Sequence, residues 1–279
     1  MNIRNVLIGL IAPAALAGIV SCGGGSDSPA PAIVVRSASL SGAQETPPTG
    51  ATGTGRGAVV VNPTTKEITG GITFTGLTTI PPTAQHIHQA PTGNPAGAGS
   101  PIITLTLSPN NSSATIPAGM TLSDAQYAAF VAGELYFNVH TTANIGGEIR
   151  GQINGATGIT AGLATLNGAQ EVPTNASTAT GRGTIVFESA TPYNVLIAYV
   201  THNVAGANNA HVHTGVPGVS GLANVVNPMT AGTGVYSAPY GATLTAQNVL
   251  DFNLGNTYFN VHSPAPYTAG EIRGQIAVQ

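Results

Sequence analysis

The feature that most constrains the fold is an internal duplication. Three motifs occur twice in the same order, and each second copy follows the first after 123 to 126 residues. The first copies begin at Leu40, Thr54 and Gly147, and the second copies begin at Leu166, Thr180 and Gly270. A repeat of this length is a whole domain and not one unit of a solenoid. We therefore expect two domains, residues 33–154 and 159–279, which lie close together because the linker between them is short.

The composition favours β-structure and excludes a nucleic-acid partner. Only 6% of the 279 residues are charged, the net charge is −3, and the chain holds 37 glycines and 20 prolines. A basic surface that could neutralise phosphates is therefore missing. Disorder is not expected either, since 42% of the residues are hydrophobic.

Within each copy the sequence reads as one strand after another. Apolar segments at 57–61 and 183–187 predict strands, and turn residues separate them from the segments that follow. One short helix per copy is expected, because the Ser-Asp-Ala-Gln sequence at 123–126 resembles a capping box. The predicted fold class is all-β: two tandem Greek-key β-sandwich or barrel domains, each with one short α-helix before the penultimate strand.

The first residues carry a targeting signal. A short basic start and the apolar stretch 6–20, which Pro13 interrupts, are typical of a secretory signal peptide. The sequence Ile-Val-Ser-Cys that ends at Cys22 resembles a bacterial lipobox. This resemblance implies a lipoprotein signal peptide at 1–21 and lipidation of Cys22; the alternative is an ordinary signal peptide with an incidental cysteine.

The expected location follows from that signal. Residues 22–32 predict a flexible tether behind the lipid anchor. We expect an extracytoplasmic protein in the cell envelope whose membrane contact is the lipid at Cys22. In a Gram-negative source, Gly23, which stands next to the cysteine in place of an aspartate, favours the outer membrane. The expected location is therefore the outer membrane or the cell surface.

The histidines are concentrated in the repeated motifs. The chain has seven, and six of them lie in two His-x-His segments and two Tyr-Phe-Asn-Val-His segments. The seventh, His202, has no counterpart. Because side chains alternate between the two faces of a strand, both histidines of a His-x-His segment share one face. In the same way Tyr136, Asn138 and His140 share a face, and the apolar residues between them face the core.

Two histidines on one strand and a third on a neighbour can supply three nitrogen ligands. Such a set suits Zn²⁺ or Cu²⁺ and leaves one coordination position open. The expected sites, one in each domain, are His86, His88 and His140, and His211, His213 and His262. The alternative is a set of histidines that only hydrogen-bond strands and loops together.

The two copies also share a small set of charged residues. The matching acids are Glu45, Glu148, Glu171 and Glu271, and the matching bases are Arg56, Arg150, Arg182 and Arg273. Ion pairs on a sheet face are one interpretation. In the other interpretation, Glu148 or Glu45 and their counterparts orient a histidine through its second ring nitrogen. No serine or cysteine nucleophile stands beside a histidine at matching positions, so no catalytic residue is assigned.

Taken together, the motifs resemble those of the CHRD domain, a type of domain named after chordin. The resemblance covers nearly all of the chain after the tether and depends on Leu-x-Gly-x-x-Glu-x-Pro, His-x-His and Gly-Glu-Ile-Arg-Gly-Gln-Ile. It implies an extracellular all-β module. In chordin the context is antagonism of secreted growth factors, and for bacterial members the resemblance implies no particular reaction.

The sequence is compatible with three functions. The first is a metal-binding surface module with the six histidines as ligands. The second is a module without enzymatic activity that binds an extracellular protein or a glycan. The third is a metalloenzyme of the dismutase or hydrolase type. The cheapest observation that separates the two metal-dependent functions from the second is whether three histidine side chains converge in each copy.

Overall fold

The computed structural model describes residues 33–232 and 234–279. The predicted signal peptide, Cys22 and the tether lie outside the described residues, so their assignment stays a prediction. In the described part of the chain no helix has the length and the apolar character needed to cross a membrane.

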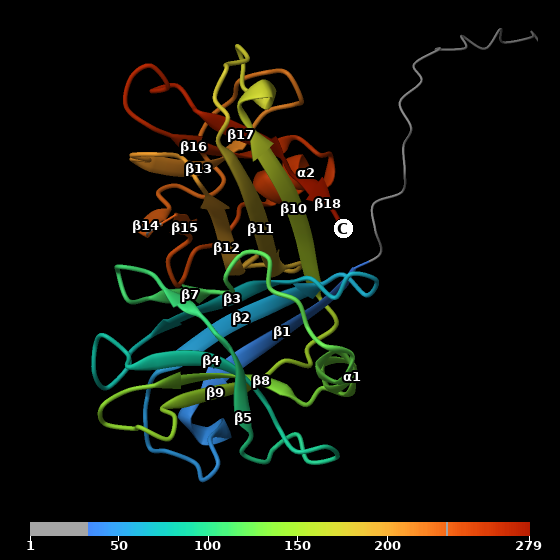
Figure 1. Ribbon diagram of the computed structural model, residues 1–279, viewed down its shortest axis with the longest axis vertical. Helices are drawn as coiled ribbons and strands as arrows, with labels where there is room; N and C mark the ends of the chain where they lie inside the picture. The colour runs from blue at the N-terminus through green and yellow to red at the C-terminus, as the bar shows by residue number, and fades with distance from the viewer. Residues whose placement is uncertain (1–32, 233) are drawn as a thin grey trace, which may run out of the picture. The chain divides into compact units, whose positions relative to one another are not determined.

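The first copy forms one nine-stranded sheet. Its strands are β1 (Val34–Ser41), β2 (Thr54–Val61), β3 (Ile68–Thr75), β4 (Ala84–Gln89), β5 (Ser100–Thr104), β6 (Thr106–Leu107), β7 (Ser113–Thr115), β8 (Leu135–His140) and β9 (Ile149–Gln152). Their order across the sheet is β5-β4-β8-β9-β1-β2-β3-β7-β6, so the connection from β3 to β4 crosses from one half of the sheet to the other. The sheet curls into a nearly closed barrel (Figure 1).

The second copy has nearly the same arrangement. Its strands are β10 (Ile159–Asn167), β11 (Thr180–Glu188), β12 (Val195–His202), β13 (Asn209–Thr214), β14 (Thr230–Gly232), β15 (Val235–Ser237), β16 (Thr257–His262), β17 (Ile272–Gln275) and β18 (Ala277–Val278). Their order is β13-β16-β17-β10-β11-β12-β15-β14, with β18 paired to β10. Among the described residues, no strand takes the place of β5 beside β13. The 3₁₀ turns η1 (Gly42–Gln44) and η2 (Gly168–Gln170) follow β1 and β10. The predicted all-β class with two tandem domains is confirmed.

One helix occurs in each copy, as the capping signals predict. Helix α1 (Asp124–Ala132) begins with a complete capping box at Ser123 and ends at Gly133, whose left-handed φ of 74° favours glycine. Helix α2 (Ala246–Asn253) begins with the same arrangement at Thr245. Each helix leads into the strand that carries the Tyr-Phe-Asn-Val-His sequence. The short β18 is an additional strand at the end of the second copy.

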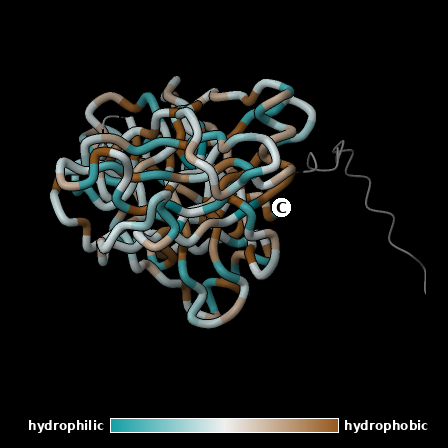
Figure 2. The backbone as a smooth tube through the Cα atoms, turned by 90° about the horizontal axis from the view of Figure 1, so that it is seen from below, coloured by the Kyte–Doolittle hydropathy of each residue, from teal (hydrophilic) through white to brown (hydrophobic). Residues whose placement is uncertain are grey.

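Alternation along the strands separates core residues from site residues. On β8, Leu135, Phe137 and Val139 are fully buried in the hydrophobic core of the first copy. Their neighbours Tyr136 and Asn138 point to the opposite face, and they are also buried. Hydrophobic and hydrophilic residues therefore follow one another closely along the chain (Figure 2).

The two copies share a third apolar cluster. On β2, all residues from 58 to 61 are buried, because one face packs inside its own barrel and the other packs against the second copy. Strand β12 of the second copy likewise packs one face inside its own barrel and the other against the first copy. The Tyr199 hydroxyl accepts a hydrogen bond from the backbone nitrogen of Gly70 at 3.0 Å. This contact explains why these strands read as continuous apolar runs and not as alternating ones.

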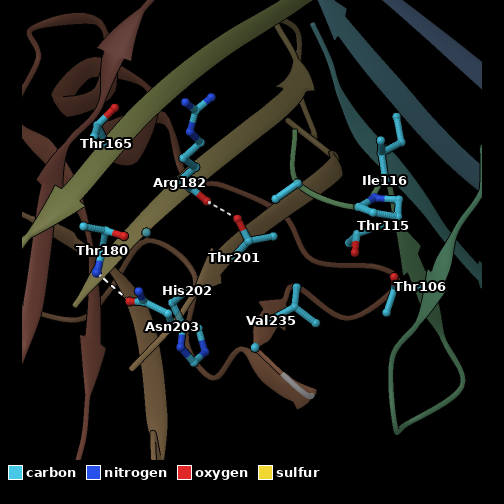
Figure 3. Close-up of a pocket in the computed structure, with 14 residues that line it drawn as sticks. Thr106, Thr115, Ile116, Thr165, Thr180, Arg182, Thr201, His202, Asn203 and Val235 are labelled. Carbon is cyan, nitrogen blue, oxygen red and sulfur yellow. Dashed lines mark hydrogen bonds between the residues drawn. The ribbon is translucent and has the colours of Figure 1, made fainter. Parts of the chain in front are cut away.

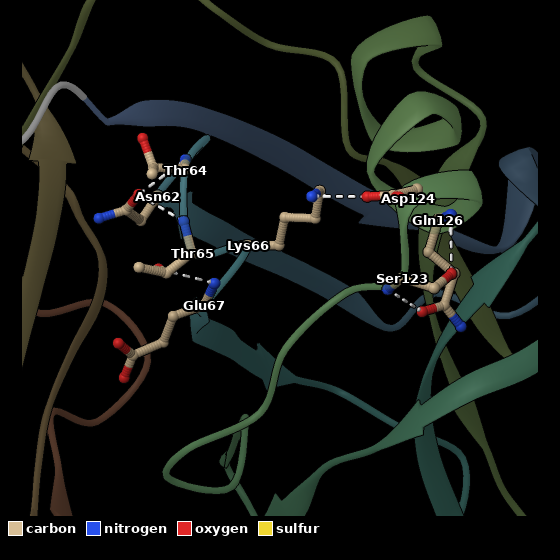
Figure 4. A network of polar contacts seen from close by, with 8 residues as sticks. All are labelled: Asn62, Thr64, Thr65, Lys66, Glu67, Ser123, Asp124 and Gln126. Atoms are coloured by element: carbon tan, nitrogen blue, oxygen red, sulfur yellow. Dashed lines mark hydrogen bonds and ion pairs between the residues drawn. The ribbon is translucent and has the colours of Figure 1, made fainter.

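A polar network fixes the turn between β2 and β3 (Figure 4). The side-chain oxygen of Asn62 accepts hydrogen bonds from the backbone nitrogens of Thr64 and Thr65. The next residue, Lys66, has a left-handed φ of 57° and forms an ion pair with Asp124 in the first turn of α1. The turn and the helix are thus connected at the end of the barrel.

Candidate metal centres

The pairing of β4 with β8 brings three histidines together in the first copy. The two strands are antiparallel, with Ala84 opposite His140, His86 opposite Asn138 and His88 opposite Tyr136. The three histidine side chains lie on the same face of these neighbouring strands. Their ring centroids are 5.1 to 5.6 Å apart.

The ring nitrogens meet at one point. One nitrogen from each ring can be chosen so that all three lie within 4.8 Å of one another. In a tetrahedral zinc site, nitrogens bound at 2.0–2.1 Å are roughly 3.3 Å apart. The cluster therefore needs only a small movement of the rings to surround an ion.

Backbone carbonyls select which ring nitrogen is free. His88 Nδ1 lies 2.8 Å from the carbonyl oxygen of Gly99, and His140 Nδ1 lies 3.0 Å from that of Ile145. A carbonyl oxygen only accepts, so Nδ1 carries the proton in both rings and Nε2 keeps its lone pair. The nitrogens that remain buried without a hydrogen-bond partner are His86 Nδ1, His88 Nε2 and His140 Nε2. These are one nitrogen from each ring of the cluster.

The second copy has the same cluster on β13 and β16. His213 Nδ1 lies 3.1 Å from the Gly221 carbonyl oxygen, and His262 Nδ1 lies 3.3 Å from that of Thr268. His211 Nδ1 is 3.3 Å from His262 Nε2, which is the separation expected of two nitrogens on one tetrahedral ion. All three rings again offer nitrogens within 4.8 Å of one another.

Burial keeps the imidazoles neutral. Loss of hydration lowers the pKa of His88 and of His213 to about 4, against an ordinary value of 6.5. The pKa of His86 is lowered by burial and by the neighbouring His140. A metal ion binds the neutral ring, so these histidines need not release a proton to bind one at neutral pH.

An arginine and a tyrosine support the buried histidine of each cluster. The guanidinium carbon of Arg150 lies 3.5 Å from the ring centre of Tyr136, and this ring stacks on His88 with centroids 5.0 Å apart. In the second copy, Arg273 lies 3.5 Å from Tyr258, which stacks on His213 at 4.8 Å. The stack restricts the rotation of the histidine ring.

The same arginine holds the loop that follows the His-x-His strand. Arg150 is 2% exposed, and it donates to the carbonyl oxygens of Pro95 and Gly97 at 2.7 and 3.1 Å. The hydroxyl of Tyr136 accepts from the backbone nitrogen of Gly99 at 2.9 Å. Because the Gly99 carbonyl also selects the His88 tautomer, the arginine, the loop and the ligand nitrogen form one connected unit.

A buried glutamate lies beside the cluster without touching a histidine. Asn138 donates to one carboxylate oxygen of Glu45 at 3.2 Å, while Glu45 Oε1 and Asn138 Oδ1 have no partner. Burial raises the pKa of Glu45 to about 7, although Asn138 and Arg150 lower it. Glu171 and Asn260 repeat the arrangement, and burial raises the pKa of Glu171 to about 7 as well.

The second pair of glutamates holds loops. Glu148 accepts from Thr78, Thr141 and Asn144. Burial raises the pKa of Glu148, but these hydrogen bonds outweigh it and the net shift is downward. Glu271 accepts from the hydroxyls of Ser177 and Ser263.

The hydrogen bonds of the charged residues that the two copies share do not match either interpretation of the sequence. Among the described residues, no glutamate hydrogen-bonds a clustered histidine; in four of the six rings Nδ1 contacts a backbone carbonyl, whose position depends on loop geometry. Glu148 and Arg150 also do not pair across the sheet face, since the arginine binds loop carbonyls instead. Among the described residues, the ion pair that involves a motif arginine is Arg182 with Glu67 of the other copy.

A cavity between the two copies lies away from both clusters. It measures about 590 Å³ and is lined by residues of both copies, many of them threonines (Figure 3). His202 contributes to its wall, but Nδ1 of that ring accepts from the backbone nitrogen of Val204 at 3.2 Å and the ring stacks on Tyr236. The seventh histidine thus stands apart from the two clusters.

Comparison with known families identifies both copies. The family model described as CHRD domain matches residues 36–153 and 163–276. The chain belongs to the CHRD domain family. A search of curated proteins and a search of solved structures gave no significant match.

The CHRD match places the histidine clusters inside the repeated unit. Strand alternation predicted which residues share the face of each cluster, and the structure brings all six histidines together as two sets of three. The Arg–Tyr–His stacks were missed. Their signal was present, because Tyr136 occupies the same face as His140 and Arg150 recurs as Arg273, but the loop that they hold could not be placed from the sequence.

Proposed function

We propose that each CHRD copy binds one divalent transition-metal ion, Cu²⁺ or Zn²⁺, through its three histidines. The observation that carries this proposal is the convergence of three ring nitrogens in each copy. In two rings of the first copy, His88 and His140, the other ring nitrogen is held by a hydrogen bond to a backbone carbonyl. Carbonyl contacts of this kind orient metal-binding histidines in many proteins. A set of purely structural histidines would have its nitrogens paired, whereas three buried nitrogens of the first copy lack a partner.

The ligand set narrows the choice of ion. Imidazole nitrogens suit Zn²⁺ and Cu²⁺, while Ca²⁺ and Mg²⁺ prefer oxygen ligands. No carboxylate belongs to either group of candidate ligands in the described part of the chain. Three ligands also leave a coordination position open, which is compatible with binding a further ligand.

Metal content of single-copy variants tests the proposal. We expect two ions per chain in the wild type, one in His88→Ala, one in His213→Ala and none in the double variant. The measurement is elemental analysis after exposure to Zn²⁺ or Cu²⁺ and removal of excess metal. His202→Ala is the matched control and should retain two ions. Equal metal content in the wild type and the double variant would exclude the proposal.

We also propose that the protein is held at the outer membrane or the cell surface by a lipid on Cys22. The support is the lipobox-like sequence and the tether that follows it. A Cys22→Ser variant should lose incorporation of labelled palmitate and leave the membrane fraction. Unchanged membrane fractionation of that variant would contradict the anchor.

A further inference from the structure

The metal cluster of the second copy opens onto a cavity. A space of about 370 Å³ is lined by Asn208, Asn209, His211, His262 and Thr268. Two of the three candidate ligands therefore face this space, while His213 is only 8% exposed. An ion held by the cluster would be reached from the cavity, on the side away from the buried histidine.

The charge around that ion would favour an anion. Three neutral imidazoles leave the full charge of a divalent ion uncompensated, because no carboxylate belongs to the group. The buried carboxylate of Glu171 accepts a hydrogen bond from Asn260 and does not belong to the ligand group. Arg273 adds a positive charge behind the cluster through its stack with Tyr258. An anionic ligand at the open position would lower the electrostatic energy of the site.

Asn209 supplies a hydrogen-bond donor at the cavity. Its side-chain oxygen accepts from the backbone nitrogen of Ala210 at 2.9 Å, which leaves the amide NH₂ group to donate. Asn209 stands opposite His262 in the β13–β16 pair. At the matching position of the first copy, Ala84 stands opposite His140 and has no donor. The chain thus contains its own comparison between a cluster with this amide and a cluster without it.

We propose that the metal centre of the second copy takes a small monodentate anion at its open coordination position, with the Asn209 amide donating a hydrogen bond to that anion. This inference rests on the proposed metal binding. The anion binds the ion through one donor atom, and the amide contact makes the second copy the stronger anion binder of the two.

Cobalt and azide provide the test. Co²⁺ reports its coordination through visible absorption, and azide is a small anionic ligand. His88→Ala leaves only the second centre, and His213→Ala leaves only the first. We expect azide to change the Co²⁺ spectrum of the His88→Ala protein with saturation. The His213→Ala protein should need ~10-fold more azide, because its centre lacks a hydrogen bond to the charged ligand.

Reciprocal substitutions isolate the amide. In the His88→Ala protein, Asn209→Ala should weaken azide binding ~10-fold. In the His213→Ala protein, Ala84→Asn should strengthen it. If Co²⁺ does not bind to either protein, the metal proposal itself fails. If Co²⁺ binds but azide leaves the spectrum unchanged, or if neither substitution alters azide affinity, the anion proposal is wrong while metal binding stands.

Discussion

The two copies have the same metal cluster in different surroundings. Each has three histidines, a stacked tyrosine and a buried arginine in equivalent positions. The residues behind them differ: Glu148 has donors from three residues, whereas Glu271 has donors from two serines. The buried Phe74 of the first copy is replaced by His202 in the second. Phe74 pairs with Gly55, and His202 pairs with Gly181, the residue that corresponds to Gly55.

The difference separates what the cluster requires from what the barrel tolerates. The tyrosine and the arginine touch a histidine or the loop that bonds to it, and they are the same in both copies. Phe74 and His202 lie in the barrel wall, where a larger neighbouring side chain can fill the volume that a smaller one leaves. On the neighbouring strand, Ala114 of the first copy pairs with Ile72 and corresponds to Tyr236 of the second copy, which pairs with Val200. The cluster thus depends on direct contacts, and the core depends on volume.

The largest expected effect comes from exchanging the core residue. Phe74→His places a polar ring in the first core, where Phe74 is 1% exposed. We expect a loss of about 3 kcal/mol in the free energy of unfolding, measured in urea. Phe74→His with Ala114→Tyr should recover part of the loss, because it rebuilds the stack seen between His202 and Tyr236. An unchanged stability of the single variant would contradict this view of the core.

An effect of similar size in each copy is expected in the pH dependence of the metal-free protein. The pKa of His88 and of His213 is about 4 when folded and ordinarily 6.5, so the unfolded chain binds more protons between these values and stability rises with pH. The pKa of Glu45 and of Glu171 is about 7 against 4.5, so their contribution to stability falls as pH rises through that range. The two contributions oppose each other in the wild type.

Replacing the acids exposes the contribution of the histidines. In Glu45→Gln with Glu171→Gln, the free energy of unfolding should rise from pH 4 to pH 6.5 by about 3 kcal/mol for each copy, a steeper increase than in the wild type. Urea unfolding in the presence of a chelator measures it. The single variants should give equal slopes if the copies are equivalent in this respect, and unequal slopes would show that they are not.

A smaller effect is expected from the arginines. Arg150→Lys or Arg273→Lys keeps the charge but loses the flat group that stacks on tyrosine and bonds two carbonyls. Metal affinity of the altered copy should fall ~10-fold, measured by competition with a chromophoric chelator. Arg36→Lys, at an arginine that bonds the Val131 carbonyl away from the cluster, is the control. Equal affinity in all three variants would mean that the stack does not position the histidine.

The smallest effect concerns the loop glutamates. Thr141→Val removes one donor from Glu148, which keeps those of Thr78 and Asn144. Ser263→Ala removes one of the two side-chain donors of Glu271. We expect losses of about 1 kcal/mol, with the larger loss for Ser263→Ala because fewer donors remain on a buried carboxylate. Urea unfolding would give the opposite order if the number of donors were unimportant.

Much of the fold could be predicted from local patterns. The capping sequence at Ser123 starts a helix because its side chain satisfies a backbone donor within the same turn. Alternation on the Tyr-Phe-Asn-Val-His strand assigned Phe137 to the core and His140 to the other face. The role of Glu148 could not be predicted, since its partners Thr78 and Thr141 lie on different loops.

By itself, the sequence determined the duplication, the all-β class and the face on which each histidine lies. These follow from repeat length and from strand geometry, which act over a few residues. Only the tertiary structure decided that the carbonyls of Gly99 and Ile145 select the ligand nitrogens of His88 and His140. It also decided that Arg150 binds the loop that runs from β4 to Gly99. Such contacts join residues 5 to 55 positions apart, and loop paths over that distance depend on the packing of the whole barrel.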